Sequence, residues 1–219
     1  MKPAFTVPTP RPLEGGAAPF QWAPVVRAVE ARRSPSPNAA PVARLEQLTP
    51  EGTTNIVLLT GRRATVGGRL WVHVRLPVLP NNTVGWIPRD ALGGYVAVHT
   101  HLVVELDRLR ATLFKNGRPI FRAAIGVGKP ESPTPRGNFY IRNVLTRFHS
   151  PFYGPVAFGT SARSAVLTDW PAGGFVGIHG TNEPQLLPGR VSHGCIRMRN
   201  SAILRLARLL PVGTPLTIR

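Results

Sequence analysis

The feature that most constrains the fold is a succession of short apolar runs separated by turn residues, with little helical periodicity. In residues 70–76, Leu and Val side chains occupy every second position and share one face, while Trp71, His73 and Arg75 share the other. This period of two predicts a half-buried antiparallel strand. Further strands are predicted at residues 56–59, 102–106, 110–121, 139–142, 165–167 and 175–178. The expected fold class is therefore mainly β.

Two local signals, a hairpin turn and a helix, refine this expectation. Asn116 and Gly117 supply the positive φ angles that a tight hairpin turn requires. One helix is predicted near the end of the chain, capped by Asn200 or Ser201 and stopped by Pro211. We therefore expect one or two short helices in an otherwise β domain.

Prolines are dense at the start of the chain, where residues 1–38 hold eight of the 24. Proline has no backbone N–H, so this density opposes both helices and central strands. We predict a disordered Pro-rich tail or linker over residues 1–38, in which only residues 25–33 carry a short helical pattern. Two domains follow in this prediction, a small β domain at 39–96 and a larger one at 97–219.

The chain is strongly basic, with 27 Lys and Arg against 10 Asp and Glu and a formal charge of +17. The excess is spread along the chain: residues 1–98 carry 11 basic and 5 acidic side chains, and residues 99–219 carry 16 and 5. Such a charge favours nucleic acid, anionic lipid or an anionic wall polymer as a partner. No nucleic-acid recognition motif accompanies it, so we expect a general attraction to polyanions and no specific nucleic-acid binding.

No apolar run approaches the roughly 18 to 20 residues of a membrane-spanning helix, so no transmembrane segment is predicted. The first residues also lack the apolar stretch of a signal peptide. Two readings of this remain open. The protein is cytoplasmic, or it is exported and its signal lies upstream or has been removed.

The only cysteine, Cys195, excludes an intrachain disulfide and a multi-cysteine zinc site. His99 and His101 could share one face of a strand, but no third ligand lies nearby in the sequence. We therefore expect surface histidines at a domain junction and no metal site.

Chemistry-bearing residues are concentrated in two segments, 178–182 and 192–200, which read IHGTN and SHGCIRMRN. A nearby imidazole can take the proton of a cysteine thiol or pair with the thiolate, which is the true nucleophile. Gly194 permits a tight backbone, and Arg197 offers a forked receptor for a carboxylate. The alternative is a purely structural role, in which the cysteine is a small core residue and the glycines form turns.

Together these segments resemble the signature of the L,D-transpeptidase family of the YkuD type. The residues at 134–139 (TPRGNF) resemble a turn of that family, and the glycines at 126 and 128 and the terminal 213–218 fall where the family has similar elements. The resemblance covers residues 97–219. It implies a mainly β fold, an L,D-transpeptidase-type sandwich or barrel with one or two short helices.

The resemblance also implies catalytic roles for individual residues. Cys195 is the nucleophile, His179 is the base, and Gly180 orients the imidazole through its backbone carbonyl. Residues i and i+2 of an extended segment lie about 6.5 to 7 Å apart, which makes His193 the weaker candidate for the base. His193 and Ser192 are then supporting residues that shape the site.

Three further functions follow from the same resemblance. The amides of Gly194 and Cys195 are expected to donate to the oxyanion of the reaction. Arg197 is expected to receive a carboxylate of the substrate. Tyr153 is a candidate substrate contact, and its alternative is an ordinary packing aromatic.

The segment at 39–96 resembles a bacterial SH3-like module, through the strand at 70–76 and the sequence VGWIPRDAL at 84–92. The alternative is a β subdomain of no particular family. The resemblance implies a small β-barrel that docks on wall glycan or peptide.

The function implied is that of a peptidoglycan L,D-transpeptidase outside the cytoplasm, in the periplasm or cell wall. Cys195, with a pKa expected below the usual value of about 8.5, attacks the bond between diaminopimelate and D-Ala in a tetrapeptide stem. An amine then resolves the thioacyl-enzyme, and no metal or organic cofactor is needed. The alternatives are an L,D-carboxypeptidase that uses water, an enzyme that uses a protein amine, and a non-catalytic binding protein.

Overall fold

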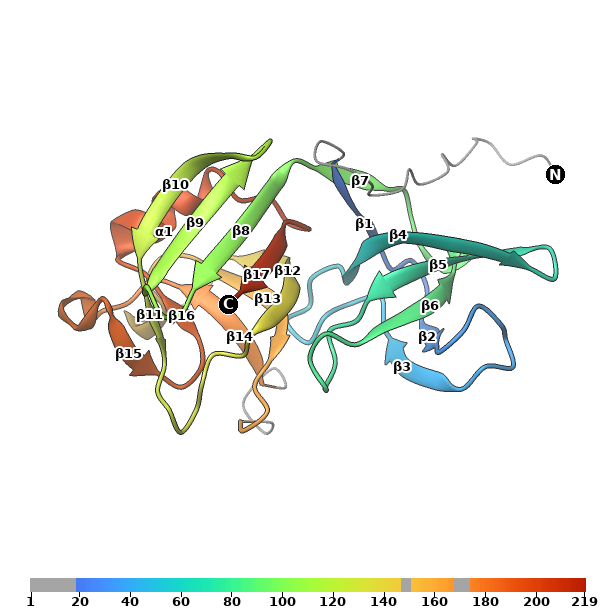
Figure 1. Cartoon of the computed structure of the whole chain (residues 1–219), viewed down its shortest axis with the longest axis horizontal. Coiled ribbons are helices and arrows are strands. Elements are labelled where there is room, and N and C mark those ends of the chain that lie inside the picture. The colour runs from blue at the N-terminus through green and yellow to red at the C-terminus, as the bar shows by residue number, and fades with distance from the viewer. Residues whose placement is uncertain (1–18, 147–150, 168–173) are drawn as a thin grey trace.

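The computed structural model describes residues 19–146, 151–167 and 174–219, and in these ranges the chain is mainly β with one α-helix (Figure 1). The strands form a seven-stranded and a ten-stranded sheet. The first sheet belongs to an N-terminal module, residues 20–98, and the second to a C-terminal unit, residues 100–219. In the described ranges no helix has the length and apolar character needed to cross a membrane.

The sheet of the N-terminal module has the strand order β3-β2-β6-β5-β4-β1-β7. Its elements are β1 (Phe20–Pro24), β2 (Val29–Arg32), β3 (Pro41–Leu45), β4 (Ile56–Val66), β5 (Arg69–Arg75), β6 (Val84–Pro88), the 3-10 helix η1 (Arg89–Ala91) and β7 (Val96–Val98). Small aliphatic side chains fill its core, among them Val57, Val72, Val74 and Ile87. The resemblance to an SH3-like barrel stays a prediction.

The start of this module corrects the predicted tail. Strand β1 pairs with both β4 and β7, and β2 pairs with β3 and β6, so residues 20–32 belong to the folded module and not to a linker. The prolines flank these strands: Pro19 precedes β1, and Pro24 is its last residue. Residues 25–33 form no helix, because Val29 and Ala31 alternate into the core with the period of a strand. The part of the predicted tail at 1–18 lies outside the described residues.

Strand β5 is confirmed, but it is buried on both faces and not on one. Trp71 and His73, predicted to face solvent, are buried beside Val72 and Val74. Partners from neighbouring strands cover this second face: Trp86 packs against the His73 ring with centroids 4.9 Å apart, and the Thr60 hydroxyl lies 2.7 Å from His73 Nδ1.

The sheet of the C-terminal unit has the strand order β10-β9-β8-β17-β12-β13-β14-β16-β11-β15 and curls around a large apolar core. Its first elements are β8 (Thr100–Glu105), β9 (Arg110–Lys115), β10 (Arg118–Ala124), β11 (Gly126–Gly128), β12 (Gly137–Leu145) and the 3-10 helix η2 (Pro151–Tyr153). The remaining elements are β13 (Ala157–Arg163), β14 (Phe175–His179), the 3-10 helix η3 (Pro184–Leu186), β15 (Gly189–Ser192), β16 (Ile196–Arg197), α1 (Asn200–Ala207) and β17 (Pro215–Ile218).

Most local predictions for this unit are confirmed. Asn116 and Gly117 have φ angles of 50° and 75° between β9 and β10. Helix α1 lies where the sequence places it, but Asn200 is already its first helical residue, and Arg199 before it makes no side-chain cap. The strand predicted at residues 165–167 does not form.

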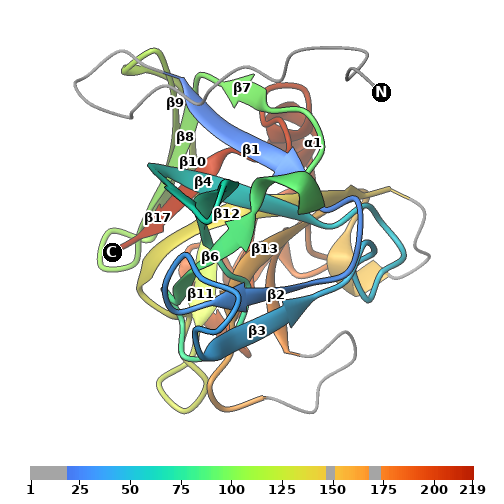
Figure 2. The same ribbon diagram turned by 90° about the vertical axis from the view of Figure 1, so that its right-hand side faces the viewer.

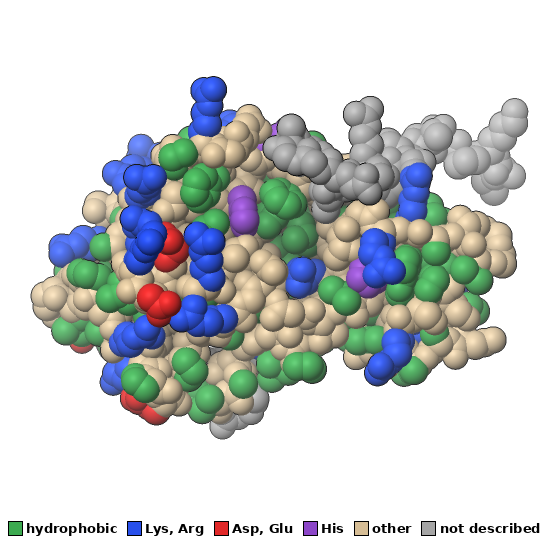
Figure 3. All heavy atoms as spheres, in the orientation of Figure 1, with side chains coloured by type: hydrophobic (Ala, Val, Ile, Leu, Met, Phe, Trp, Pro, Cys, Tyr) green, Lys and Arg blue, Asp and Glu red, His purple; other side chains and the backbone are tan. Residues whose placement is uncertain are grey.

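The two units pack closely against one another; in Figure 2 the N-terminal module lies in front of the C-terminal unit. Tyr140 of β12 is fully buried in a cluster with Ile56 and Leu58, and its hydroxyl donates to the Ile56 carbonyl at 2.9 Å. Trp22 packs so tightly over Gly213, whose φ is 81°, that no Cβ would fit there. The surface in Figure 3 shows Lys and Arg side chains spread over both units.

Candidate active site

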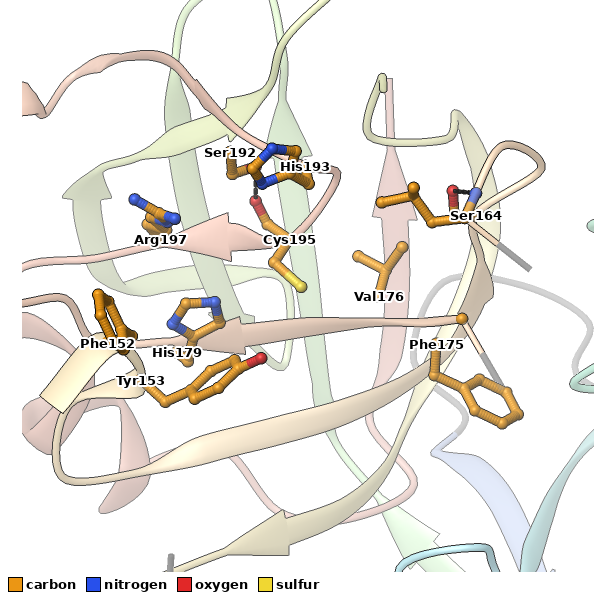
Figure 4. Close-up of a pocket in the computed structure, with 12 residues that line it drawn as sticks. Phe152, Tyr153, Ser164, Phe175, Val176, His179, Ser192, His193, Cys195 and Arg197 are labelled. Carbon is orange, nitrogen blue, oxygen red and sulfur yellow. Dashed lines mark hydrogen bonds between the residues drawn. The ribbon is translucent and has the colours of Figure 1, made fainter. Parts of the chain in front are cut away.

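Strands β14 and β16 bring the two chemistry-bearing segments together. They run parallel, with Ile178 opposite Ile196 and His179 opposite Arg197. Ile178 and Ile196 are fully buried in the core of the unit. Because side chains alternate along a strand, His179 lies on the other face of the sheet, where Cys195 also lies. Figure 4 shows their side chains on the same side of these strands.

The Cys195 thiol and the His179 imidazole both lie next to the space that a side chain at Gly177 would occupy. The Gly177 amide donates to the Cys195 sulfur at 3.3 Å. A Cβ placed on Gly177 would lie 3.8 Å from both the Cys195 Sγ atom and the His179 Cδ2 atom. The missing side chain at Gly177 leaves this space open between the two reactive groups.

His179 is held in one orientation by its backbone neighbour. Its Nδ1 atom lies 2.7 Å from the Gly180 carbonyl oxygen, which can only accept a hydrogen bond. Nδ1 therefore carries the proton, and Nε2 is left as the basic nitrogen. The Tyr153 ring lies edge-on at 4.7 Å between centroids. The side chain is only 3% exposed, and burial lowers its pKa to about 4, with Arg197 acting in the same direction.

Gly180 is required for a second reason that the sequence pattern does not indicate. A Cβ on Gly180 or on Gly154 would collide with the side-chain oxygen of Asn200. That oxygen accepts the Thr181 amide at 2.9 Å. Asn200 therefore fixes the segment directly after His179, whereas the sequence had suggested it only as a helix cap.

The Ser192 side chain closes the turn before Cys195. The Ser192 hydroxyl donates to the Cys195 carbonyl at 2.5 Å and accepts the Gly194 amide at 3.1 Å. Gly194 has a φ of 115°, which only glycine adopts readily. Since the Gly194 amide is engaged with Ser192, it is not open to an oxyanion in this conformation, contrary to expectation.

Thr134 also holds this turn, from the segment whose resemblance to a family turn gave it no individual role. Its hydroxyl donates to the Gly194 carbonyl at 2.8 Å and accepts the Gly128 amide at 2.9 Å. One buried side chain therefore connects the Cys195 turn to strand β11.

Arg197 is paired within the chain. Its Nη1 atom lies 3.1 Å from Glu183 Oε2, a partner that the sequence did not suggest. Glu183 is itself well exposed, and its amide donates to the Thr181 hydroxyl at 3.0 Å. A substrate carboxylate would have to share or displace this partner.

A cavity of about 270 Å³ opens over the two reactive side chains (Figure 4). It is lined by Phe152, Tyr153, Ser164, Leu167, Gly174, Phe175, Val176, His179, Ser192, His193, Cys195 and Arg197. The structure thus brings together every side chain predicted for the site. His193 lies at the exposed rim, while Ser192 is buried.

The thiol of Cys195 is less acidic than the sequence led us to expect. Burial raises its pKa above the ordinary value, and the Gly177 amide and the charge of Arg197 offset this only in part. His179 has a lowered pKa at the same time. Both shifts favour a neutral thiol and a neutral imidazole over an ion pair.

The histidines predicted at the domain junction lie on strand β8 and directly before it. His101 Nε2 lies 2.9 Å from the Thr217 hydroxyl, and His99 lies between β7 and β8. Over residues 19–146, 151–167 and 174–219, no group of three or more His, Cys, Asp or Glu side chains is placed to hold a metal ion.

A comparison with protein families gives a match over the C-terminal unit. The model of the YkuD family, described as the L,D-transpeptidase catalytic domain, matches residues 99–218. This match spans more than half of the 219 residues, so the chain belongs to the YkuD family of L,D-transpeptidase catalytic domains. The resemblance drawn from the sequence motifs is confirmed.

Individual relatives are similar over the same region. The L,D-transpeptidase YkuD of Bacillus subtilis is 36% identical over 118 residues, which are 54% of this chain and 65% of that protein. The YkuD protein of Bacillus licheniformis is 35% identical over 117 residues, 53% of this chain and 64% of its own length. The chain thus spans less than two thirds of either relative. An Enterococcus faecium L,D-transpeptidase catalytic domain acylated by ertapenem is 27% identical, with a TM-score of 0.42 over 56% of this chain and 98% of its own.

Proposed function

We propose that this protein is a peptidoglycan L,D-transpeptidase with Cys195 as nucleophile and His179 as base. The observation that carries the proposal is the open point above Gly177, bordered by a thiol and by an imidazole whose basic nitrogen is fixed by Gly180. A nucleophile, a base and a group that orients the base are the parts that acyl transfer needs.

In the first half of the reaction, the Cys195 sulfur attacks the carbonyl carbon between diaminopimelate and the terminal D-Ala of a tetrapeptide stem. The thiol proton passes to Nε2 of His179, and the carbonyl becomes a tetrahedral oxyanion. The imidazolium then gives this proton to the amine of D-Ala as the C–N bond breaks. D-Ala leaves, and a thioester to Cys195 remains.

In the second half, the side-chain amine of another diaminopimelate attacks the thioester. The amine loses a proton to His179, the C–S bond breaks, and the sulfur recovers a proton. An amide cross-link is formed and the free thiol is restored. Because every proton is passed between the thiol, the imidazole and the amines, the cycle uses no metal or organic cofactor.

The neutral resting pair fits this sequence of proton transfers. An imidazole with a lowered pKa is unprotonated at neutral pH and is ready to accept the thiol proton during attack. The charge of Arg197 favours the thiolate as it develops. We assign the oxyanion to the Cys195 amide, because the Gly194 amide is engaged with Ser192.

The partners and location follow from the same proposal. Peptidoglycan stem peptides are the substrates, which requires a location outside the cytoplasm, and the charge of +17 favours anionic wall polymers as a docking surface. The full chain carrying Cys195→Ala should pellet with purified sacculi, and this binding should weaken as salt is raised. Binding that ignores salt would contradict the electrostatic docking.

The test of function uses a purified disaccharide-tetrapeptide, incubated with the full chain and followed by mass spectrometry. We expect a covalent adduct equal to the stem without D-Ala, followed by a cross-linked dimer. Cys195→Ala should give neither product. A tripeptide product in place of the dimer would identify an L,D-carboxypeptidase that uses water. The intact tetrapeptide bound but unchanged would favour a non-catalytic binding protein.

A further inference from the structure

The junction between the two units and the active site share one face of the C-terminal sheet. Strands β12, β13 and β14 are neighbours, and Arg163 of β13 pairs with Phe175 of β14. The Phe175 ring lies under two guanidinium groups, with Arg142 of β12 at 3.5 Å and Arg163 at 4.7 Å from its centroid. Phe175 also lines the active-site cavity. This ring therefore lies between the junction and the site.

Glu51 of the N-terminal module holds the first of these guanidinium groups. Arg142 is only 2% exposed, and its Nη2 atom lies 2.7 and 2.8 Å from the two Glu51 carboxylate oxygens. The neighbouring Asn143 also reaches the module, donating to the Thr53 hydroxyl at 2.9 Å. A buried cation is costly unless it is paired, so Glu51 is what allows Arg142 to lie against Phe175.

Asn81 of the module holds the end of strand β13. Its side-chain oxygen accepts the Arg163 amide at 3.0 Å, and its side-chain nitrogen donates to the Arg163 carbonyl at 2.7 Å. The next residue, Ser164, donates its amide to the Gly174 carbonyl at 2.8 Å. Ser164 and Gly174 both line the cavity. The two hydrogen bonds of Asn81 therefore fix the end of β13, from which one wall of the site extends.

We propose that Asn81 and Glu51 are positioning residues for the substrate-binding wall formed by Ser164, Gly174 and Phe175. The N-terminal module is then a structural part of the active site and sets how well the donor stem is held. This deepens the proposed function and rests on it for its kinetic readout. The contacts that hold Cys195 and His179 come from other residues, so the module does not set thiol reactivity.

Asn81→Ala removes both hydrogen bonds to Arg163, and Asn82→Gly is its matched control. Asn82 comes from the same loop and also bridges the junction, but its side-chain oxygen accepts the Asn138 amide at 2.7 Å, at the start of β12 and outside the cavity lining. Asn82 has a φ of 69°, so glycine preserves its backbone. Glu51→Gln, with the exposed Glu46→Gln as control, tests the second contact.

The first readout is hydrogen exchange of the full chain, which does not depend on activity. In Asn81→Ala, the amide of Arg163 loses its acceptor, and exchange over residues 163–167 and 174–176 should become at least tenfold faster. Asn82→Gly should leave these residues unchanged. Equal exchange in wild type and Asn81→Ala would overturn the proposal.

The second readout separates binding from chemistry. For the tetrapeptide donor, we expect Asn81→Ala and Glu51→Gln to raise KM about five- to tenfold, with alkylation of Cys195 by iodoacetamide unchanged. Asn82→Gly and Glu46→Gln should retain the wild-type KM. Equal KM values in all variants, or a loss of alkylation matching the loss of turnover, would contradict a positioning role. If wild type shows no turnover, the proposed function fails, and the exchange result still decides whether Asn81 orders the wall.

Discussion

The active site and the junction lie at two ends of one sheet face, and different kinds of contact hold them. At the β14–β16 end, most contacts are local: His179 meets the adjacent Gly180, and Ser192 meets Cys195 three residues on, although Thr134 reaches Gly194 from 60 residues away. At the β12 end, they join distant parts of the chain, with Glu51 and Arg142 91 residues apart. The comparison teaches that the chemistry of this protein is built from short segments, while the wall around it depends on a second module.

This difference also explains the character of each end. The local contacts are mostly hydrogen bonds to backbone carbonyls and amides, which fix orientation without adding charge. The junction instead buries a full charge on Arg142 and relies on one carboxylate to compensate it. Substitutions at the first end should change rates, and those at the second should change stability and substrate binding.

The largest effect is expected from His179, the proposed base. His179→Ala should lower the rate of acylation by a factor of about 10² to 10⁴, the usual contribution of general base catalysis. Any destabilisation, measured as a fall in the thermal unfolding midpoint, should be far too small to account for this loss of rate. Rates from stopped or quenched reactions followed by mass spectrometry give the measurement. A loss below about threefold would assign the base to another residue, with His193→Ala as the next variant.

At the junction, Glu51→Ala should reduce the free energy of unfolding by about 3 kcal/mol, because Arg142 then carries an uncompensated buried charge. Glu46→Ala, which removes an exposed pair with Arg44, should change it by about 0 to 1 kcal/mol. Urea denaturation of both variants provides the comparison. Equal losses would show that the buried pair adds nothing beyond a surface pair.

Lowering the pH should reduce the stability of the folded protein through His179. Its pKa is about 4 in the folded protein against about 6.5 unfolded, so the unfolded chain binds more protons between these values. Stability should therefore be lost as pH falls from 6.5 to 4, by on the order of 3 kcal/mol. His179→Asn should flatten this slope. The pH dependence of stability that remains in this variant is expected from His73 and His101, whose pKa values burial also lowers.

Alkylation should report the raised pKa of Cys195. Because only the thiolate reacts, the rate with iodoacetamide should rise about tenfold per pH unit from pH 6 to 8, without a plateau. A rate that is already flat at pH 6 would indicate a preformed thiolate–imidazolium pair and would contradict the neutral resting state.

The smallest effect is expected at the Cys195 turn. Thr134→Val keeps the volume but removes the hydroxyl that bridges Gly194 and Gly128, at a cost of about 1 to 2 kcal/mol. Acylation should slow as the turn loosens. Thr217→Val, which removes a hydroxyl on β17 outside the lining of the active-site cavity, serves as the control. Equal acylation in both variants would remove Thr134 from the account of the site.

The sequence predicted what is encoded by neighbours in the chain. The hairpin at Asn116, helix α1 and the placement of His179 and Cys195 around one cavity all follow from short patterns. The proline density of the first 38 residues concealed strand β1, Phe20–Pro24, whose partner β4 lies more than 30 residues on. Proline density therefore says little when the prolines flank strands.

The missed parts of the site depend on pairings that no local pattern marks. Asn81 and Glu51 come from loops of the other module. Glu183 has no distinctive sequence context, and it pairs with Arg197 because strands β14 and β16 are neighbours in the sheet. The prediction of a lowered Cys195 pKa was wrong, because burial raises the pKa of this thiol. Burial also lowers the pKa of His179.

The most direct test of the central claim is intact-mass spectrometry of the full chain after exposure to a carbapenem. The strained β-lactam carbonyl is an acyl donor that a competent thiol opens to a stable thioester. We predict one adduct in wild type, none in Cys195→Ala, and slow formation in His179→Ala. A folded wild type that forms no adduct, or an adduct that survives Cys195→Ala, would contradict Cys195 as the nucleophile.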